Sequence, residues 1–574
     1  MTGRILTAMG MACVLAGQGV AQEAAFFSDM DRIHPVWAEN GMVSAQERVA
    51  AEIGRDILAQ GGNAVDAGVA VAFALAVTLP RAGNIGGGGF MLVHDAETGQ
   101  THAIDYREMA PSGASRDMFL DDAGEADSEK SLRSGAASGV PGTVAGMRMA
   151  LENYGSMEWA EVIAPAIRLA DEGITVTPEL ADSLEAERDN LSKHPSTAAI
   201  FFKPDGAAWR PGEKLVQADL AQTLKAVAEQ GPDGFYKGAV AQNIAKAIQA
   251  AGGPMTVEDL AAYKPVLREP VRGTYRGYDI VSMPPPSSGG VHLIQILNTL
   301  EGYPIGALGH NSAETIHLMA EAMKLAYADR SEYLGDPDFF DVPVAALTSK
   351  DYAAELRAKI SNDFATPSPM IKPGDLAPYE SDQTTHFSIV DKEGNAVTNT
   401  YTINLDYGSG LVAAGTGVLM NNEMDDFSAK PGVPNAFGLV GGEANAVAAG
   451  KRPLSSMTPT LVLKDGKVWL ATGSPGGARI ITTTLQVIMN MIDHGMNVAE
   501  ASTAPRIHHQ WLPDELRIEE GISVDTLRLL AAKGHTISEK PVMGSTQSIM
   551  RDPDSGALLG ASDPRRPDAA TVGF

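Results

Sequence analysis

Apolar residues recur at helical spacing near the start of the chain. From Val49 to Ile57 every fourth position is apolar, which predicts a helix that ends at the glycine pair beginning with Gly61. Asn63 is a suitable cap for a second helix that runs to about Leu79. This second helix carries alanine and valine on every side, so we expect it to be buried between layers.

A glycine-rich run, Gly83–Gly89 (GNIGGGG), follows the second helix. A dinucleotide site needs a strand before its glycines and a helix after them. Here the order is reversed, because a helix precedes the run and a predicted hairpin, Phe90–Asp95 with His102–Asp105, follows it. The run is therefore interpreted as a place of tight backbone packing and not as a nucleotide site.

Residues 140–360 have mainly helical patterns. The Pro284–Gly290 run (PPPSSGG) interrupts them and is predicted to be a packed turn that leads into a helix from His292. Ser361–Gln383 is polar, contains four prolines and lacks an apolar period, which is typical of a linker or exposed tail. Predicted helices include Met147–Asn153, Leu220–Ala228 and Ala313–Tyr333.

After Gln383 the pattern changes to β. Asp465-Gly466 between two branched segments is a strong signal for a two-residue hairpin. Strands and helices cluster separately instead of alternating, which predicts an α+β fold with antiparallel sheets. The predicted elements are strands Thr385–Val390, Ala396–Ile403, Thr460–Lys464, Lys467–Thr472, Ser545–Arg551 and Ala557–Ala561, and a helix from about Ala478 to Asp493.

Charge narrows the classes of partner. The 574 residues include 44 Lys and Arg against 71 Asp and Glu, a formal net charge of −27. Like charges repel, so the balance opposes binding to nucleic acid or anionic lipid. No segment after the N-terminus is long and apolar enough to be a membrane span.

The N-terminus has the pattern of a cleavable secretory signal. Arg4 precedes an apolar stretch, Ile5–Gly17, and the small residues Gly19 and Ala21 then fit a leader peptidase site. We expect residues 1–21 to be removed and the protein to be periplasmic or secreted. The only cysteine, Cys13, lies inside this signal, so the mature chain has no disulfide and no thiol catalysis.

Thr384 begins the β-rich part, and by itself it is an ordinary strand threonine. It is followed, in order, by Gly394-Asn395, Val397, Thr400, Thr402, Asn404 and Tyr407-Gly408. The further matching segments are Asp105–Pro111 (DYREMAP), Pro284–Gly290, Ala328–Pro337 (ADRSEYLGDP), Asn421–Phe427 (NNEMDDF), Lys451–Met457 (KRPLSSM), Gly473–Gly477 (GSPGG) and Gly544–Met550 (GSTQSIM). Over nearly the whole mature chain, this set resembles the γ-glutamyltransferase (γ-glutamyltranspeptidase) family, bacterial periplasmic type.

The resemblance implies an N-terminal nucleophile hydrolase fold, with two stacked antiparallel sheets between helical layers (αββα). A threonine hydroxyl needs a base beside it, and the α-amine of the same residue serves only when that residue begins a chain. We therefore expect self-cleavage between Gln383 and Thr384. The products are a large subunit, 22–383, and a small subunit, 384–574, which stay together in one intertwined fold. The family position of Thr402 implies that its hydroxyl orients Thr384.

Other family positions supply the rest of the site. Gly476 and Gly477 open a helix, so their free N–H groups suit an oxyanion hole. Recognition of a γ-glutamyl donor requires groups for an α-carboxylate and an α-ammonium. Arg107, Ser455 and Ser456 are the expected carboxylate ligands, and Glu423, Asp426 and Asn404 the expected ammonium ligands.

The segment Pro431–Gly450 resembles the lid loop of bacterial members, with Phe437 at its tip where some members have tyrosine. Loss of that hydroxyl predicts looser closure. Neighbouring His508 and His509 would point to opposite faces of a strand, so a shared metal is not expected. Asp552–Gly556 suits a turn better than a calcium loop. No cofactor and no metal are expected.

The function implied is γ-glutamyl transfer from glutathione or related γ-glutamyl amides to water, amino acids or dipeptides. One alternative is a cephalosporin (glutaryl) acylase, whose donors lack the α-amino group, so the carboxylates of Glu423 and Asp426 argue against it. Another is a secreted binding protein with a degenerate fold, which would not be cut.

Overall fold

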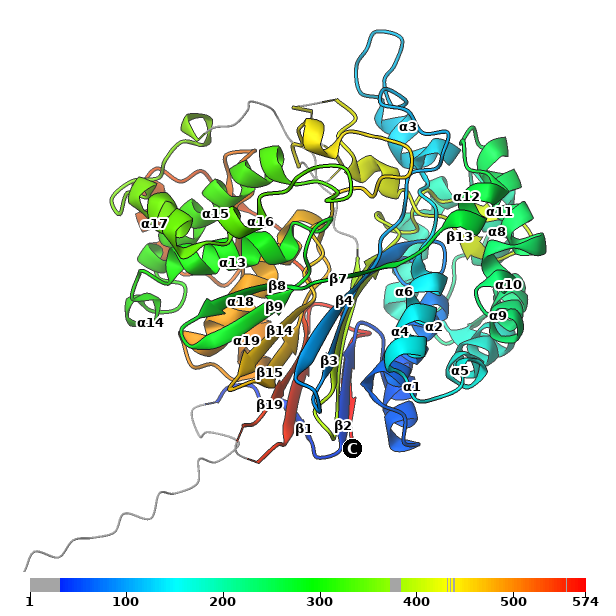
Figure 1. Ribbon diagram of the computed structural model, residues 1–574, viewed down its shortest axis with the longest axis horizontal. Helices are drawn as coiled ribbons and strands as arrows, with labels where there is room; N and C mark the ends of the chain where they lie inside the picture. The colour runs from blue at the N-terminus through cyan, green and yellow to red at the C-terminus, as the bar shows by residue number, and fades with distance from the viewer. Residues whose placement is uncertain (1–30, 372–383, 431, 434, 437–438, 554) are drawn as a thin grey trace, which may run out of the picture.

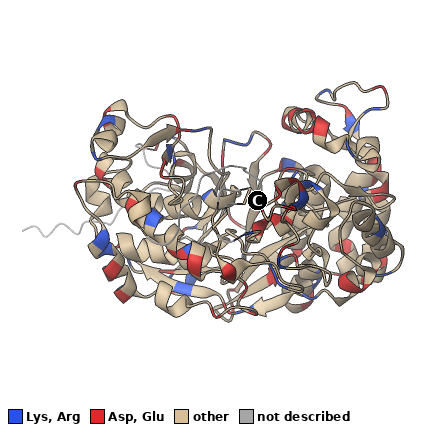
Figure 2. Ribbon diagram, turned by 90° about the horizontal axis from the view of Figure 1, so that it is seen from above, with Lys and Arg blue, Asp and Glu red and all other residues tan. Residues whose placement is uncertain are grey.

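The computed structural model describes residues 31–371, 384–430, 432–433, 435–436, 439–553 and 555–574 (Figure 1). The predicted signal, residues 1–21, and two residues of the predicted site, Gln383 and Phe437, lie outside the described residues. Within the described part of the chain, no helix has the length and apolar character needed to cross a membrane. Figure 2 shows acidic and basic residues interspersed over helices on both sides of the molecule.

Two seven-stranded antiparallel sheets form the centre of the fold. The first has the order β21-β2-β10-β11-β3-β4-β7 and the second β1-β20-β19-β15-β14-β9-β8. The first sheet comprises β21 (Ala570–Gly573), β2 (Gly41–Ala45), β10 (Thr385–Asp391), β11 (Ala396–Thr402), β3 (Gly88–Asp95), β4 (Gln100–Tyr106) and β7 (Val266–Arg268). The second comprises β1 (Val36–Ala38), β20 (Leu558–Ser562), β19 (Gln547–Arg551), β15 (Lys467–Thr472), β14 (Thr460–Lys464), β9 (Tyr278–Ser282) and β8 (Val271–Tyr275).

The sheets stack face to face and helices cover both outer faces (Figure 1). Phe90, Leu92, Val390, Leu461 and Ile549 are buried between the sheets. The first sheet is covered by α1 (Arg48–Ala59), α2 (Ala64–Thr78), α4 (Thr143–Tyr154), α5 (Trp159–Glu172) and α9 (Ala218–Gln230). The second is covered by α13 (Gly289–Leu300), α15 (Ala313–Tyr333), α18 (Ile480–Ile492) and α19 (Val498–Thr503). The predicted four-layer α+β fold is confirmed.

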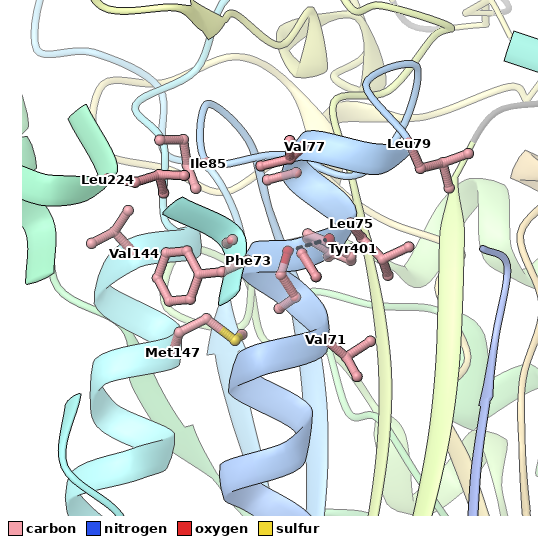
Figure 3. Close-up of a cluster of buried hydrophobic side chains, with 14 of the residues drawn as sticks. Val71, Phe73, Leu75, Val77, Leu79, Ile85, Val144, Met147, Leu224 and Tyr401 are labelled. Carbon is pink, nitrogen blue, oxygen red and sulfur yellow. Dashed lines mark hydrogen bonds between the residues drawn. The ribbon is translucent and has the colours of Figure 1, made fainter. Parts of the chain in front are cut away.

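The apolar helix predicted after Asn63 is α2, and every one of its residues is buried. Asn63 caps it, accepting hydrogen bonds from the next turn, while the Asp66 side chain bonds back to the Asn63 N–H. Figure 3 shows its Phe73 side chain facing Met147 of α4. On its other side, the Tyr401 hydroxyl donates to the Ala72 carbonyl at 2.9 Å. The helix is thus packed between another helix and the first sheet, as its composition predicts.

The structure adds detail to two parts of the sequence interpretation. The region expected to be mainly helical also contributes β7, β8 and β9, short strands that lack a long alternating pattern. Most of the described part of the expected linker, 361–371, is exposed or half-buried, but two of its residues are anchored. Ser368 is fully buried, and the indole N–H of Trp511 donates to the carbonyls of Ser368 (3.0 Å) and Ile371 (3.2 Å). These backbone contacts leave no signal in an apolar period.

Strands from distant parts of the chain alternate in the first sheet. β10 and β11 form a hairpin after the predicted cleavage site, yet β10 pairs with β2 and β11 with β3, both from the N-terminal part. Thr384 therefore directly precedes β10, a central strand whose backbone is paired on both sides. The two predicted subunits share one sheet.

The glycine run lies against β11, as the expected close packing requires. A Cβ added to Gly87 would lie 2.1 Å from the Thr402 carbonyl oxygen and 2.8 Å from Oδ1 of Asn84. We expect Gly87→Ala to lower the free energy of unfolding by about 1–3 kcal/mol, because a methyl group is forced into a packed site. Thermal denaturation measures the change, with Gly68→Ala as the control. Gly68 is also buried, but a Cβ added there meets no atom nearer than 3.3 Å. Equal stability of the two variants would contradict the prediction.

His292 in α13 is fully buried, with Nδ1 2.6 Å from Oε1 of Gln295. Burial lowers the pKa of His292 from 6.5 to about 3. Between pH 6.5 and about 3, His292 is protonated in the unfolded chain but neutral in the folded protein. The free energy of unfolding therefore decreases as the pH falls below 6.5. The expected slope is about 1.4 kcal/mol per pH unit. His292→Gln should remove that slope in denaturant titrations over this range; parallel curves for the two proteins would contradict it.

Candidate active site

Thr384 and Thr402 lie at one end of the β10–β11 hairpin. Thr384 directly precedes β10 and is 6% exposed, and Thr402 ends β11 and is 3% exposed. The backbone N–H of Asn404 donates to the Thr402 hydroxyl at 2.9 Å. Both threonines line the same small cavity. Its other lining residues are Arg107, Arg330, Asn404, Glu423, Asp426, Leu439, Ser455, Ser456, Met457, Gly477 and Ile480.

The turn between β15 and α18 forms another wall. Gly476 has φ 132° and Gly477 φ 54°, both in the region that favours glycine. Gly477 begins a short 3₁₀ turn before α18, and it lines the cavity with Thr384. The Ser545 N–H donates to the Ser474 hydroxyl at 2.9 Å, which ties this turn to the segment before β19. The structure therefore brings Gly477 to the candidate nucleophile, as predicted, while Gly476 is adjacent to that lining residue.

An arginine and two carboxylates form the charged wall. Arg107 follows β4, is fully buried, and donates to Glu423 and, at 2.5 Å, to Asp426. Both carboxylates come from one 3₁₀ turn, Glu423–Asp426. Burial opposes the charge on Arg107, but the two carboxylates outweigh it and raise its pKa. Arg107, a predicted carboxylate ligand, is thus ion-paired with Glu423 and Asp426, two predicted ammonium ligands.

A third carboxyl in this cluster, Glu108, was not predicted. It is fully buried, and one of its oxygens lies 3.6 Å from Nη1 of Arg107. Burial raises the pKa of Glu108 to about 7 and, against the effect of Arg107, raises that of Glu423 well above its usual range. The cluster holds a proton more readily than exposed carboxylates do. Its position beside Arg107 in the DYREMAP segment was the available signal.

Ser455 and Ser456 are held by the proline-rich turn. The Ser288 N–H donates to the Ser455 carbonyl at 2.8 Å, and the Ser455 N–H donates to the Pro286 carbonyl at 2.9 Å. The packed turn predicted for this run is confirmed. Arg330 of α15 also lines the cavity and donates to the Ser456 hydroxyl at 3.2 Å. It was missed because α15 is buried on nearly all sides, so no polar face marks this residue.

Described parts of the 431–450 segment contact the acidic turn. Leu439 lines the cavity, the Asn435 side-chain amide donates to Asp426 at 3.1 Å, and the Ala436 N–H donates to Asp425 at 2.8 Å. The interpretation of this segment as a lid stays a prediction.

The two neighbouring histidines have separate partners. Nδ1 of His508 lies 2.8 Å from the Thr482 hydroxyl, and Nε2 of His509 lies 3.3 Å from Asp514. Away from the cavity, one group in the described ranges brings three candidate metal-ligand atoms within 4.8 Å of one another: His317, Glu321 and His535. Glu321 is already paired with Lys324 at 2.5 Å, so we interpret this group as a hydrogen-bonded network.

Comparison with known proteins identifies the family. The model of the gamma-glutamyltranspeptidase family matches residues 50–573. The glutathione hydrolase proenzyme of Escherichia coli (strain K12) is 59% identical over 545 residues, covering 95% of this chain and 93% of the relative. The acylase ACY 1 proenzyme of Pseudomonas sp. (strain SE83) is 40% identical over 536 residues, covering 92% of each.

Solved structures agree with this match. The cephalosporin acylase from Bacillus halodurans superposes with a TM-score of 0.84 at 31% identity, covering 97% of this chain and 99% of that one. A chain of the Helicobacter pylori gamma-glutamyltranspeptidase superposes with a TM-score of 0.56 at 48% identity. The match covers 57% of this chain and 93% of the Helicobacter pylori chain. Similarity over nearly the full length, in sequence and in fold, shows that the chain belongs to the gamma-glutamyltranspeptidase family.

Proposed function

We propose that this protein is a glutathione hydrolase and γ-glutamyltransferase that cleaves itself before Thr384 and then uses Thr384 as its nucleophile. The observation that carries the proposal is the single cavity in which Thr384, Thr402 and Gly477 meet Arg107 and the acidic turn. That cavity combines a hydroxyl nucleophile with charged groups of both signs, which a γ-glutamyl donor needs.

Self-cleavage begins with attack of the Thr384 hydroxyl oxygen on the Gln383 carbonyl carbon. The C–N bond between the two residues breaks, the acyl group passes to oxygen, and the amine of Thr384 is released. Water then hydrolyses the ester and restores the hydroxyl. The proenzyme names of the sequence relatives support this step, as does a Helicobacter pylori chain that matches only 57% of this one. The resulting subunits are 22–383 and 384–574.

The freed amine then acts as base for γ-glutamyl transfer. It takes the proton of the Thr384 hydroxyl as the oxygen attacks the γ-amide carbonyl carbon of the donor. The N–H groups of Gly476 and Gly477 stabilise the oxyanion. The amine product leaves with a proton, and water or an amino acid or dipeptide accepts the glutamyl group. Because the Thr402 hydroxyl accepts from Asn404, its own proton can be donated toward Thr384.

Donor recognition uses the charged wall. We place the α-ammonium against Glu423, Asp426 and Asn404, and the α-carboxylate against Arg107, Ser455 and Ser456. Arg107 pairs with both carboxylates. The donor is a zwitterion at its α-carbon, so its two charges replace part of that pairing without adding net charge.

Replacing Glu423 by glutamine tests the ammonium site. A charged acceptor binds an ammonium more strongly than an amide does, so we expect about tenfold weaker donor binding. The measurement is the inhibition constant of L-glutamate. The control is Glu443→Gln, because the Glu443 carboxylate is exposed and pairs with Arg116. Unchanged affinity in the Glu423 variant would contradict the assignment.

A glutaryl acylase is the second candidate, favoured by the acylase relatives. Its donors lack the α-amino group and would leave the carboxylates of Glu423 and Asp426 without an added cation. Relative rates on γ-glutamyl and glutaryl anilides decide between the two, and faster glutaryl hydrolysis would overturn our choice.

One experiment tests cleavage and activity together. Denaturing electrophoresis should show two bands, and the smaller fragment should begin at Thr384 by mass or Edman analysis. The purified protein should hydrolyse a γ-glutamyl anilide. A single uncut band would contradict the proposal and favour a binding protein. The N-terminus of the larger fragment tests the further proposal that residues 1–21 are a signal for export to the periplasm.

A further inference from the structure

Arg330 is a buried cation on the serine side of the cavity. Its side chain lines the cavity and the residue is 4% exposed. Among the residues that the structure describes, no carboxylate lies within ion-pairing distance of its guanidinium. It donates instead to two neutral hydroxyls, from Nε to Ser288 at 2.9 Å and from Nη2 to Ser456 at 3.2 Å. Burial lowers the pKa of Arg330 to about 10, so it remains charged at neutral pH.

A guanidinium donates hydrogen bonds and accepts none, and this fixes the roles of its partners. The Ser288 hydroxyl accepts from Arg330 and donates its own hydrogen bond to the Ser455 carbonyl oxygen at 2.8 Å. The Ser456 hydroxyl likewise accepts from Arg330, which leaves its proton for another acceptor. The Ser455 hydroxyl accepts from the Met457 N–H at 3.1 Å and also keeps its proton. Two neighbouring serines are thereby set as donors.

The charge balance points to the same kind of ligand. Arg107 already pairs with Glu423 and Asp426, so much of its charge is neutralised before a donor binds. Arg330 contributes a positive charge at the serine side of the cavity that no described carboxylate pairs with. A group that accepts hydrogen bonds and carries a negative charge fits both requirements, and a carboxylate is such a group.

We propose that Arg330 is a positioning residue that holds the Ser456 hydroxyl as a donor and makes this side of the cavity select a substrate carboxylate. This rests on the proposed function, because it assigns the α-carboxylate of the γ-glutamyl donor to that side. Arg330 acts through Ser456 and by its charge, and it takes no part in bond breaking.

Three anilide donors separate this role from a structural one. The γ-glutamyl donor carries both α-groups, the glutaryl donor only the carboxylate, and the 4-aminobutanoyl donor only the amine. For Arg330→Gln we expect KM to rise about 10- to 100-fold with the first two donors. With the third it should change less than about threefold. An equal loss with all three donors, or no change with any, would overturn the proposal.

Further variants separate the proposed role from a folding defect. Arg330→Lys keeps the charge but lacks the planar fork whose separate nitrogens reach Ser288 and Ser456, so its KM should lie between those of wild type and Arg330→Gln. In a Ser456→Ala background, Arg330→Lys should have a smaller effect than in wild type, since part of its action is already lost. Full additivity would contradict the positioning role. Glu332→Gln, an exposed residue of the same helix, should behave as wild type.

Failure of the proposed function is recognised separately. It would appear as wild-type protein that does not hydrolyse the γ-glutamyl anilide. Calorimetry with L-glutamate, glutarate and 4-aminobutanoate then tests Arg330 by binding alone. Weaker binding by Arg330→Gln only for the first two would support the carboxylate assignment, and equal binding of all three by both proteins would overturn it.

Discussion

Replacing Thr384 by alanine should leave the protein as one uncut chain and lower γ-glutamyl anilide hydrolysis by at least about 10⁴-fold, since loss of a nucleophile has effects of that size. The variant lacks the oxygen that attacks Gln383 and the oxygen that carries the acyl group. Because the amine is also never released, both steps fail from one change. Denaturing electrophoresis and steady-state kinetics measure the two losses.

Thr385→Ala is the matched control. Thr385 is the next residue and is fully buried, and its hydroxyl has no hydrogen-bond partner in the described structure. We expect it to be cut and active. Thr384→Ser keeps a hydroxyl and should also be cut, more slowly or at a similar rate. Cleavage of Thr384→Ala at the same position would show that another group performs the reaction.

Replacing Arg107 by methionine should lower kcat/KM for a γ-glutamyl donor by about 10³-fold, or about 4 kcal/mol. The side chain of Arg107 is fully buried and bonds two carboxylates and the Pro453 carbonyl. Its removal takes away the proposed partner of the α-carboxylate. It also leaves Glu423 and Asp426 without their cation, so these groups will take up protons and bind an ammonium poorly.

The control is Arg116→Met, because Arg116 is partly exposed and pairs with exposed carboxylates. It removes the same charge and should change kcat/KM little. Circular dichroism and the extent of self-cleavage show whether Arg107→Met folds. A folded, cut Arg107 variant with unchanged kcat/KM would refute the assignment.

The sequence predicts local elements well where one physical signal dominates. The strands of the Asp465-Gly466 hairpin agree with β14 and β15 residue for residue, because both turn residues adopt the positive φ that this pair favours. Asn63 and the apolar run after it likewise predict α2. Strands β8 and β9 were missed because they are short, and because β9 is joined to the sheet through β14, which lies far along the chain, while β8 pairs with β9 at the sheet edge.

The candidate site also contains residues that the sequence predicts and residues that it does not. Family motifs name Thr384, Arg107 and the acidic turn, and the structure brings these residues into one cavity. Arg330 and Glu108 were not predicted, because a single charged residue gives no periodic pattern that would place it in the site. Only their tertiary neighbours, Ser456 for one and Arg107 for the other, reveal what they contact.

The interleaving of β10 and β11 with β2 and β3 has a consequence for reversibility. Before the cut, unfolding and refolding concern one molecule, and the outcome does not depend on protein concentration. After the cut, a molecule that unfolds fully releases two chains that must find each other again, so recovery becomes a second-order process. Neither piece can complete the first sheet alone. After maturation, dilute protein that has unfolded regains the native state only slowly. The lifetime of the native protein then depends on how rarely the first sheet opens.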